Sequence, residues 1–207
     1  MPANYTAVHT LPTYVVPDAF IAYAGPGPAV YVPLSRVDSN AAPFLHETAH
    51  AILWPERPAA RFIADTAERR RAREAFPTWM NEGLPEYIAK TIGPPLHLPD
   101  HDTMLSGGLG GVDRSCASYV SAPDTVRFFR WIGSTQAPPQ LMQDRVGVAR
   151  PFYVCSFSFT KFLVARFGIR PVVALFYSDH VVADLEGMSG LRDDTLRARW
   201  LAEIMKR

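Results

Sequence analysis

Proline constrains the fold of this chain more than any other residue type. The sequence has 19 prolines in 207 residues, and they recur from Pro2 to Pro171. Proline lacks a backbone N–H and fixes φ, so it interrupts helices and central strands alike. We therefore expect short elements joined by many turns. The hydrophobic fraction of 48% and the charged fraction of 20% are those of a globular chain that can build one sizeable core.

The first third of the chain is predicted to form a small sheet. Residues 13–16, 19–24 and 29–34 are rich in Val, Tyr, Ile and Phe, as strands are. The stretch GPGP at 25–28 separates the last two as a turn. We expect this sheet within residues 13–37.

Helices are predicted for most of the remaining chain. Asp38, Ser39 and Asn40 suit a helix cap, and Pro55 ends the first helix because a residue before proline avoids the helical region. The expected helices are 41–54, 58–75, 78–92, 124–132, 151–167, 171–178 and 190–206. Residues 93–122 are rich in Gly, Pro, Ser and Asp and are predicted to be a long loop.

The expected fold class is α+β, with a small N-terminal sheet followed by a mainly helical body. We expect one domain over 1–207. Its sheet lobe covers about 1–92, its helical lobe covers about 123–207, and the loop 93–122 lies between them.

Charge and hydropathy exclude several kinds of partner. The net charge is +1, and the basic run ERRRARE at 68–74 is flanked by glutamates, so we expect that nucleic acid is not a binding partner. No apolar run is long enough to span a bilayer, so we expect no membrane partner. The first residues lack the basic and apolar pattern of a signal peptide. The sequence as written predicts a cytoplasmic protein, or a secreted one if a leader was removed.

Two cysteines are too few to define a disulfide framework. Cys116 and Cys155 are either two buried thiols or a single disulfide in a secreted form. The sequence leaves both possibilities open, and it leaves the oligomeric state open too.

Residues 46–50 carry the pattern His-Glu-x-x-His inside the first predicted helix. A spacing of four puts His46 and His50 on one helix face, where both imidazoles can bind one ion. Glu47 lies beside the ion rather than on it, as a base for a metal-bound water must. Catalytic zinc usually has three protein ligands, so a third is needed.

Three parts of the sequence are candidates for the third ligand. A metzincin arrangement needs Gly at position 53 and His at position 56, but the chain has Leu53 and Glu56 there. His97 and His101 lie in the predicted loop. The strongest candidate is the stretch 77–90.

Two glutamates four residues apart make the stretch 77–90 the best candidate. Glu82 can close a His-His-Glu site from a helix packed on the first one. Glu86 lies on the same helix face and can accept a hydrogen bond from the outer N–H of a ligand histidine.

This arrangement resembles the gluzincin metallopeptidases, most closely the aminopeptidase N-like and small peptidase MA-like domains. The resemblance is carried by His-Glu-x-x-His followed by WMNEGLPEY at 79–87. It implies a zincin-like fold, zinc as the cofactor, Glu82 as third zinc ligand and Glu86 as a partner of a ligand histidine. The stretch between His50 and Glu82 is longer than in the aminopeptidases, and we assign the excess to the segment 58–75.

A second part of the resemblance lies at 153–168. There Tyr153 falls on the catalytic tyrosine of the aminopeptidases, while Ser156, Leu163 and Gly168 fall on the residues that follow it. A tyrosine in the first turn of a helix can donate a hydrogen bond to the oxyanion formed from a carbonyl. Tyr119 and Tyr177 are weaker alternatives for this role.

The sequence therefore predicts one zinc ion held by His46, His50 and Glu82, and hydrolysis of a peptide or protein substrate. Glu47 acts as general base and Tyr153 as oxyanion stabiliser. The segment AYAGPGPAV at 22–30 lacks the acidic residue with which aminopeptidases bind a free amino terminus, which favours an open, endopeptidase-like cleft. The alternatives are a catalytically silent zinc-binding or regulatory domain and a metal-free helical interaction protein.

Overall fold

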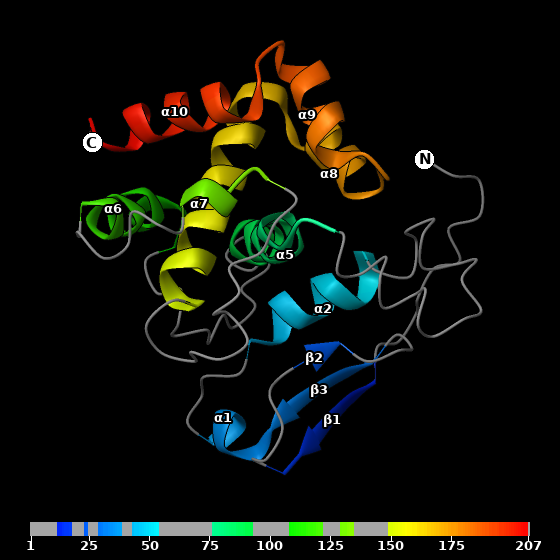
Figure 1. Ribbon diagram of the computed structural model, residues 1–207. Coiled ribbons are helices and arrows are strands. Elements are labelled where there is room, and N and C mark those ends of the chain that lie inside the picture. Colours follow the sequence, from blue (N-terminus) through cyan, green and yellow to red (C-terminus); the bar gives the residue numbers. More distant parts are fainter. Residues whose placement is uncertain are drawn as a thin grey trace.

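The structure is a computed structural model of the whole chain (Figure 1). It describes residues 12–17, 23–24, 29–38, 43–53, 76–92, 108–121, 129–134 and 149–206. Within these ranges an α+β layout is present, with one small sheet and a larger helical part.

The sheet has three strands in the order β1-β3-β2. They are β1 (Thr13–Val16), β2 (Tyr23–Ala24) and β3 (Val30–Pro33). The first pairs parallel to β3 and the second pairs antiparallel to it. All three lie within the predicted strands. The prediction was wrong at Leu34, where α1 (Leu34–Asp38) already begins.

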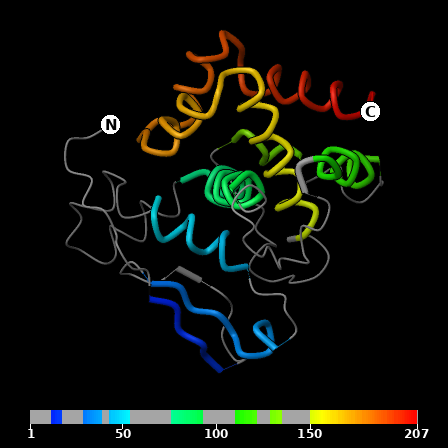
Figure 2. The backbone as a smooth tube through the Cα atoms, turned by 180° about the vertical axis from the view of Figure 1, so that it is seen from behind, coloured from blue at the N-terminus to red at the C-terminus, as the bar shows by residue number. Residues whose placement is uncertain are grey.

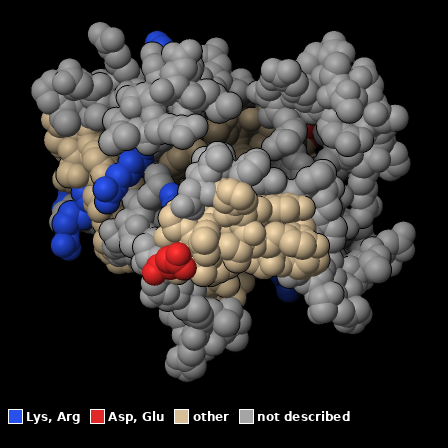
Figure 3. Space-filling view, turned by 90° about the horizontal axis from the view of Figure 1, so that it is seen from below, with Lys and Arg blue, Asp and Glu red and all other residues tan. Residues whose placement is uncertain are grey.

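The two faces of the sheet differ. Val30 and Val32 are fully buried and pack with Ala51 of α2 (Phe44–Leu53). On the opposite face Tyr14 stacks on Tyr31, with ring centroids 5.2 Å apart, and remains half exposed. Figure 3 views the molecule from this side and shows mostly uncharged side chains on the described surface, with charged ones at its margin.

The helical part follows α2 along the chain. Its elements are α5 (Thr78–Ile92), α6 (Gly108–Val120), a short 3-10 helix (Phe129–Trp131), α7 (Ala149–Phe167), α8 (Ile169–Phe176), α9 (Val181–Ser189) and α10 (Asp193–Ile204). Figures 1 and 2 both show α2 between the sheet and α5, so that the sheet, α2 and the larger helical group are stacked in that order.

The main core lies around α7, which is buried among the other helices. Its side chains Phe152, Phe157, Phe159 and Leu163 are fully buried, and they pack with Trp79 of α5 and Trp200 of α10.

Gly168 follows α7 with a φ of 82°, and its N–H donates to the Val164 carbonyl at 2.8 Å. This is the glycine end that the sequence predicted for this helix.

The predicted loop 93–122 was wrong for its second half, because α6 occupies Gly108–Val120. Val112 and Cys116, four residues apart, are buried against the core. This helix is difficult to predict from the sequence, because it contains or follows the glycines 107, 108, 110 and 111, and glycine has a low intrinsic helix propensity. Packing on α7 outweighs that propensity. Residues 93–107 lie outside the described part.

Other helices also differ from the prediction. The helix predicted for 190–206 is present as α10, whereas α9 was not predicted at all. Of the helix predicted at 124–132, the described part contains only the short 3-10 turn. The predicted helix 58–75 and the effect of Pro55 lie outside the described residues.

Cys116 and Cys155 form a disulfide that joins α6 to α7. Of the two possibilities that the sequence left open, the structure has the disulfide. In the described ranges, no helix combines the length and the apolar character needed to cross a membrane.

Candidate metal centre

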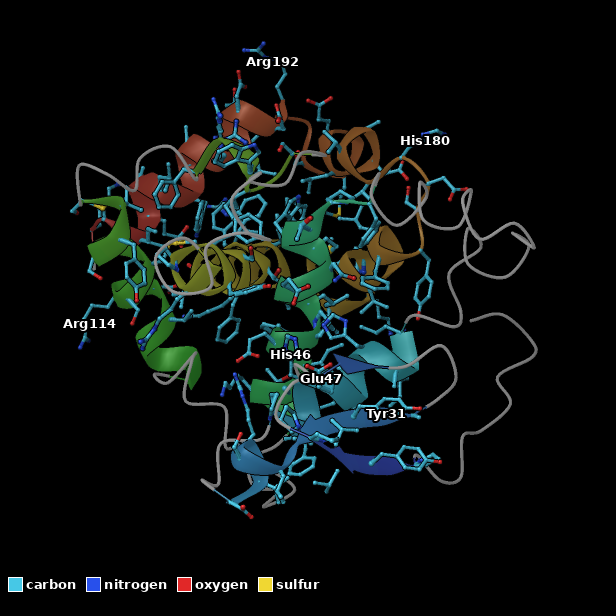
Figure 4. All side chains as sticks on the ribbon, turned by 60° about the horizontal axis from the view of Figure 1, so that its bottom comes forward. Tyr31, His46, Glu47, Arg114, His180 and Arg192 are labelled. Atoms are coloured by element: carbon cyan, nitrogen blue, oxygen red, sulfur yellow. A yellow bond between two sulfur atoms is a disulfide. The ribbon has the colours of Figure 1, made fainter. Side chains whose placement is uncertain are left out.

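The helix α2 carries the His-Glu-x-x-His residues between the sheet and α5. Its first turn closes where the Glu47 N–H donates to the Pro43 carbonyl at 3.0 Å. Ala51 packs against the sheet and Leu53 packs in the main core, which holds α2 between the two. His46 and Glu47 lie where α2 meets α5 (Figure 4).

Three side chains on α2 and α5 present their ligand atoms to one point. Nε2 of His46 and Nε2 of His50 are 3.0 Å apart. Oε2 of Glu82 lies 3.5 Å from the first nitrogen and 3.6 Å from the second. In the described part of the chain these residues form the group of His, Cys, Asp and Glu side chains that could hold a metal ion.

These distances fit a tetrahedral zinc ion. Zinc bonds to nitrogen and oxygen of about 2.1 Å at a tetrahedral angle place neighbouring ligand atoms about 3.4 Å apart. The two imidazoles and one carboxylate also match the ligand types of catalytic zinc, with a fourth position for water. Both histidine side chains are 13% exposed and Glu82 is 19% exposed, so solvent reaches the group.

Glu86 holds the other side of His46. Its Oε2 lies 3.0 Å from Nδ1 of His46, which leaves Nε2 facing His50 and Glu82. This is the contact that the sequence predicted for Glu86. Glu86 is almost fully buried, at 1% exposure.

Glu82 also has a neighbour that the sequence did not single out. Nδ2 of Asn81 donates to Oε1 of Glu82 at 2.8 Å, which leaves Oε2 toward the histidines. Lys90 was missed as well. It is buried one turn after Glu86, and its Nζ lies 3.5 Å from Glu86 Oε1. The sequence signal that could have identified Lys90 is its position four residues after Glu86, because opposite charges at that spacing are neighbours on a helix.

The ionisable side chains of this group interact strongly with one another. Burial works to lower the pKa of His46, but the hydrogen bonds to Glu82 and Glu86 and the charge of Glu47 outweigh it and hold that pKa well above its usual value. Burial works to raise the pKa of Glu82, and the two histidines outweigh it and hold that pKa well below its usual range. Both shifts reflect negative and positive charges gathered at one point.

Glu47 and Tyr153 complete the surroundings of this point. Glu47 is 7% exposed and next to His46 in the chain. Tyr153 lies half-buried on α7, and its pKa is raised by burial first and then by the charges of Glu82 and Glu47. The phenol is therefore within electrostatic reach of both carboxylates.

The structure thus brings together His46, His50 and Glu82 and places Glu86 on His46. Glu47 and Tyr153 lie beside this group. The alternative ligands His97 and His101 lie outside the described residues. Comparison with protein-family models, with curated proteins and with solved structures found no match to this chain.

Proposed function

We propose that this chain is a zinc-dependent metallopeptidase of the gluzincin type, with a zincin-like fold. One observation carries the proposal: the ligand atoms of His46, His50 and Glu82 lie 3.0–3.6 Å apart, at the spacing of a zinc site. A buried carboxylate and a phenol lie beside them.

His46, His50 and Glu82 would hold the ion, and bound zinc would supply Lewis-acid activation of a water molecule and of the substrate carbonyl. Glu86 fixes the ring of His46 through Nδ1. With that nitrogen occupied, Nε2 is the nitrogen of His46 that would bind the ion.

Glu47 is the proposed general base. Its carboxylate is buried beside His46 and outside the ligand group. It takes a proton from the attacking water and passes the same proton to the leaving amine, so the carboxylate is restored at the end of the cycle.

Tyr153 is the proposed oxyanion stabiliser. Its raised pKa keeps the phenol O–H protonated, so that it can donate a hydrogen bond to the carbonyl oxygen as negative charge develops there. Donation from a neutral phenol needs no proton transfer.

The proposed substrate is a peptide or protein. This assignment rests on the resemblance to gluzincins of the segments 46–50, 79–87 and 153–168. The lack of an acidic residue in the segment 22–30 supports internal cleavage over removal of amino-terminal residues. Nucleic acid and membrane are not among the proposed partners.

The Cys116–Cys155 disulfide bears on the proposed location. Disulfides persist in oxidising compartments and are rare in the cytosol. Of the two locations consistent with the sequence, we therefore favour the secreted one.

The decisive experiment compares the unmodified protein with Glu47→Gln on a peptide library. We expect the variant to bind one zinc ion per chain, because Glu47 is not a ligand. Hydrolysis should fall about 10²–10⁴-fold, the usual contribution of a general base. Zinc content is measured by elemental analysis and cleavage by mass spectrometry, with and without a chelator.

Glu203→Gln serves as the matched control, because Glu203 pairs with Arg166 on the surface at 2.9 Å. It should keep full activity. Undiminished hydrolysis by Glu47→Gln would contradict the mechanism. Stoichiometric zinc without any hydrolysis in the unmodified protein would favour the catalytically silent zinc-binding domain instead.

A further inference from the structure

Lys90 is a lysine buried close behind the candidate metal centre. It lies on α5 one turn after Glu86 and is 8% exposed. Burying an ammonium group is costly unless it is paired, so a lysine in this position requires a compensating charge. Its Nζ lies 3.5 Å from Oε1 of Glu86.

The two oxygens of Glu86 face different partners. Oε2 meets Nδ1 of His46 at 3.0 Å, and Oε1 faces the ammonium of Lys90. Among the described residues Oε1 accepts no hydrogen bond. The ion pair with Lys90 is therefore the contact that distinguishes one oxygen from the other.

A carboxylate can rotate about its last bond, and a rotated Glu86 would no longer hold Nδ1 of His46 in line. The ring of His46 could then turn and carry Nε2 away from His50 and Glu82. Partners of metal-binding histidines fix ring orientation in this way, and losing one typically costs 10–100-fold in metal affinity or activity.

We propose that Lys90 is a positioning residue for the metal centre. Its ammonium orients the Glu86 carboxylate, which in turn holds Nε2 of His46 toward the ion. This role rests on the proposed function, because it requires that His46 be a zinc ligand. It extends the line of contacts from the centre to a third residue, in the order His46, Glu86, Lys90.

The chain contains a matched ion pair away from the centre. Nζ of Lys161 on α7 donates to Oδ2 of Asp113 on α6 at 2.7 Å, and Asp113 is buried. Asp113 also accepts a hydrogen bond from Ser158, whose hydroxyl in turn accepts one from Trp200. Removing Lys161 therefore disturbs a buried carboxylate in the core and leaves the ligand residues untouched.

The test compares Lys90→Met with Lys161→Met. Zinc affinity is measured by competition with a chromophoric chelator, and folding is measured on the metal-free proteins by circular dichroism and thermal unfolding. We expect Lys90→Met to bind Zn²⁺ about 10–100-fold more weakly than the unmodified protein. Lys161→Met should bind it equally well, even where its unfolding temperature falls.

A second variant separates orientation from packing. Lys90→Arg keeps a positive charge beside Oε1 of Glu86 on a side chain of different shape. We expect it to bind Zn²⁺ more tightly than Lys90→Met and close to the unmodified protein. If Lys90→Met does not fold, Lys90→Gln, which is neutral but polar, takes its place.

Unchanged zinc affinity in Lys90→Met would overturn the role of Lys90 while leaving the proposed function in place. A Lys90→Arg variant that binds zinc as weakly as Lys90→Met would overturn it too, since the loss would then come from the shape of the side chain and not from its charge. If the unmodified protein binds no zinc, the proposed function fails and the role of Lys90 fails with it.

Discussion

Tyr153 differs from the residues on either side of it in how deeply its side chain is buried. Phe152 and Val154 on either side are buried in the main core, whereas Tyr153 is half-buried and feels the charges of Glu82 and Glu47. The same turn of α7 thus anchors the helix with its flanking side chains and directs one phenol to the candidate metal centre.

We expect Tyr153→Phe to lower kcat about 10²–10³-fold, the usual cost of losing one oxyanion donor. Zinc affinity should not change, because the phenol is not in the ligand group. The pKa of Tyr153 is raised above 10, so its phenol stays protonated through the neutral and mildly alkaline range. The loss should therefore be equal at pH 6 and pH 9, as measured by the two rate profiles.

Tyr119→Phe on α6 is the control for this prediction, because Tyr119 is another candidate from the sequence. It should leave kcat unchanged. A larger loss of activity in Tyr119→Phe than in Tyr153→Phe would show that the oxyanion role does not belong to Tyr153.

Residues differ in how much of their role the sequence reveals. The alignment of His46 and His50 follows from local helix periodicity and could be predicted. The meeting of Glu82 with them depends on the packing of α5 on α2, so the sequence could offer Glu82 only as a candidate, which the resemblance to gluzincins then supported. Lys90 was missed because a lysine four residues after a glutamate is common on solvated helix faces, and its burial is visible only in the fold.

Gly83 determines how closely two elements approach each other. A Cβ atom at this position would lie 2.5 Å from the Ser156 carbonyl oxygen and 2.5 Å from Oγ1 of Thr160. Both belong to α7, so α5 and α7 touch through backbone at this point. Gly83 directly follows Glu82, and this contact sets the separation between Glu82 and Tyr153.

We expect Gly83→Ala to lower the free energy of unfolding by about 1–3 kcal/mol, since overpacking forces a helix to move. This reverses the usual effect, because alanine in a helix interior is favoured over glycine by about 1 kcal/mol. Activity should fall further than zinc affinity, because the displaced helix carries Tyr153. Chemical denaturation and zinc titration measure the two effects.

Gly187→Ala is the matched control, because Gly187 lies within α9 and has no atom within 4 Å of an added Cβ. It should raise the free energy of unfolding by up to about 1 kcal/mol. Equal stabilisation by both substitutions would show that α5 and α7 are not in close contact.

The elements were predictable where local signals agreed with packing. Strand β1, the helix α5 and the glycine end of α7 follow from composition, periodicity and breakers. The helix α6 was not predictable, because its first turns contain several glycines and its stability comes from burial of Val112 and Cys116 against the core. The predicted single domain, with a sheet lobe and a helical lobe, stays a prediction.

In the whole molecule, the Cys116–Cys155 disulfide ties α6 to the buried helix α7. The two cysteines are separated by 39 residues, and a loop of that length loses considerable entropy when it is closed in the unfolded chain. The proposed zinc ligands lie on α2 and α5, so this link stabilises the helical part without touching them.

We expect reduction of the disulfide to lower the free energy of unfolding by about 4 kcal/mol, by the chain-entropy relation. Zinc affinity of the protein that remains folded should be unchanged. Urea unfolding with and without a reducing agent measures the effect. The variant with Cys116→Ala and Cys155→Ala should show no response to the reductant, and identical midpoints for the oxidised and reduced protein would contradict the prediction.

The position of α2 between the sheet and α5 has a further consequence. An ion held by His46 and His50 on one side and by Glu82 on the other would add a further link between α2 and α5, beside the contact of His46 with Glu86. Because such an ion binds the folded chain and not the unfolded one, it would add about 2.7 kcal/mol to the free energy of unfolding at a free concentration 100 times its dissociation constant. By mass action, the stability of the folded protein would then increase with the free concentration of the metal.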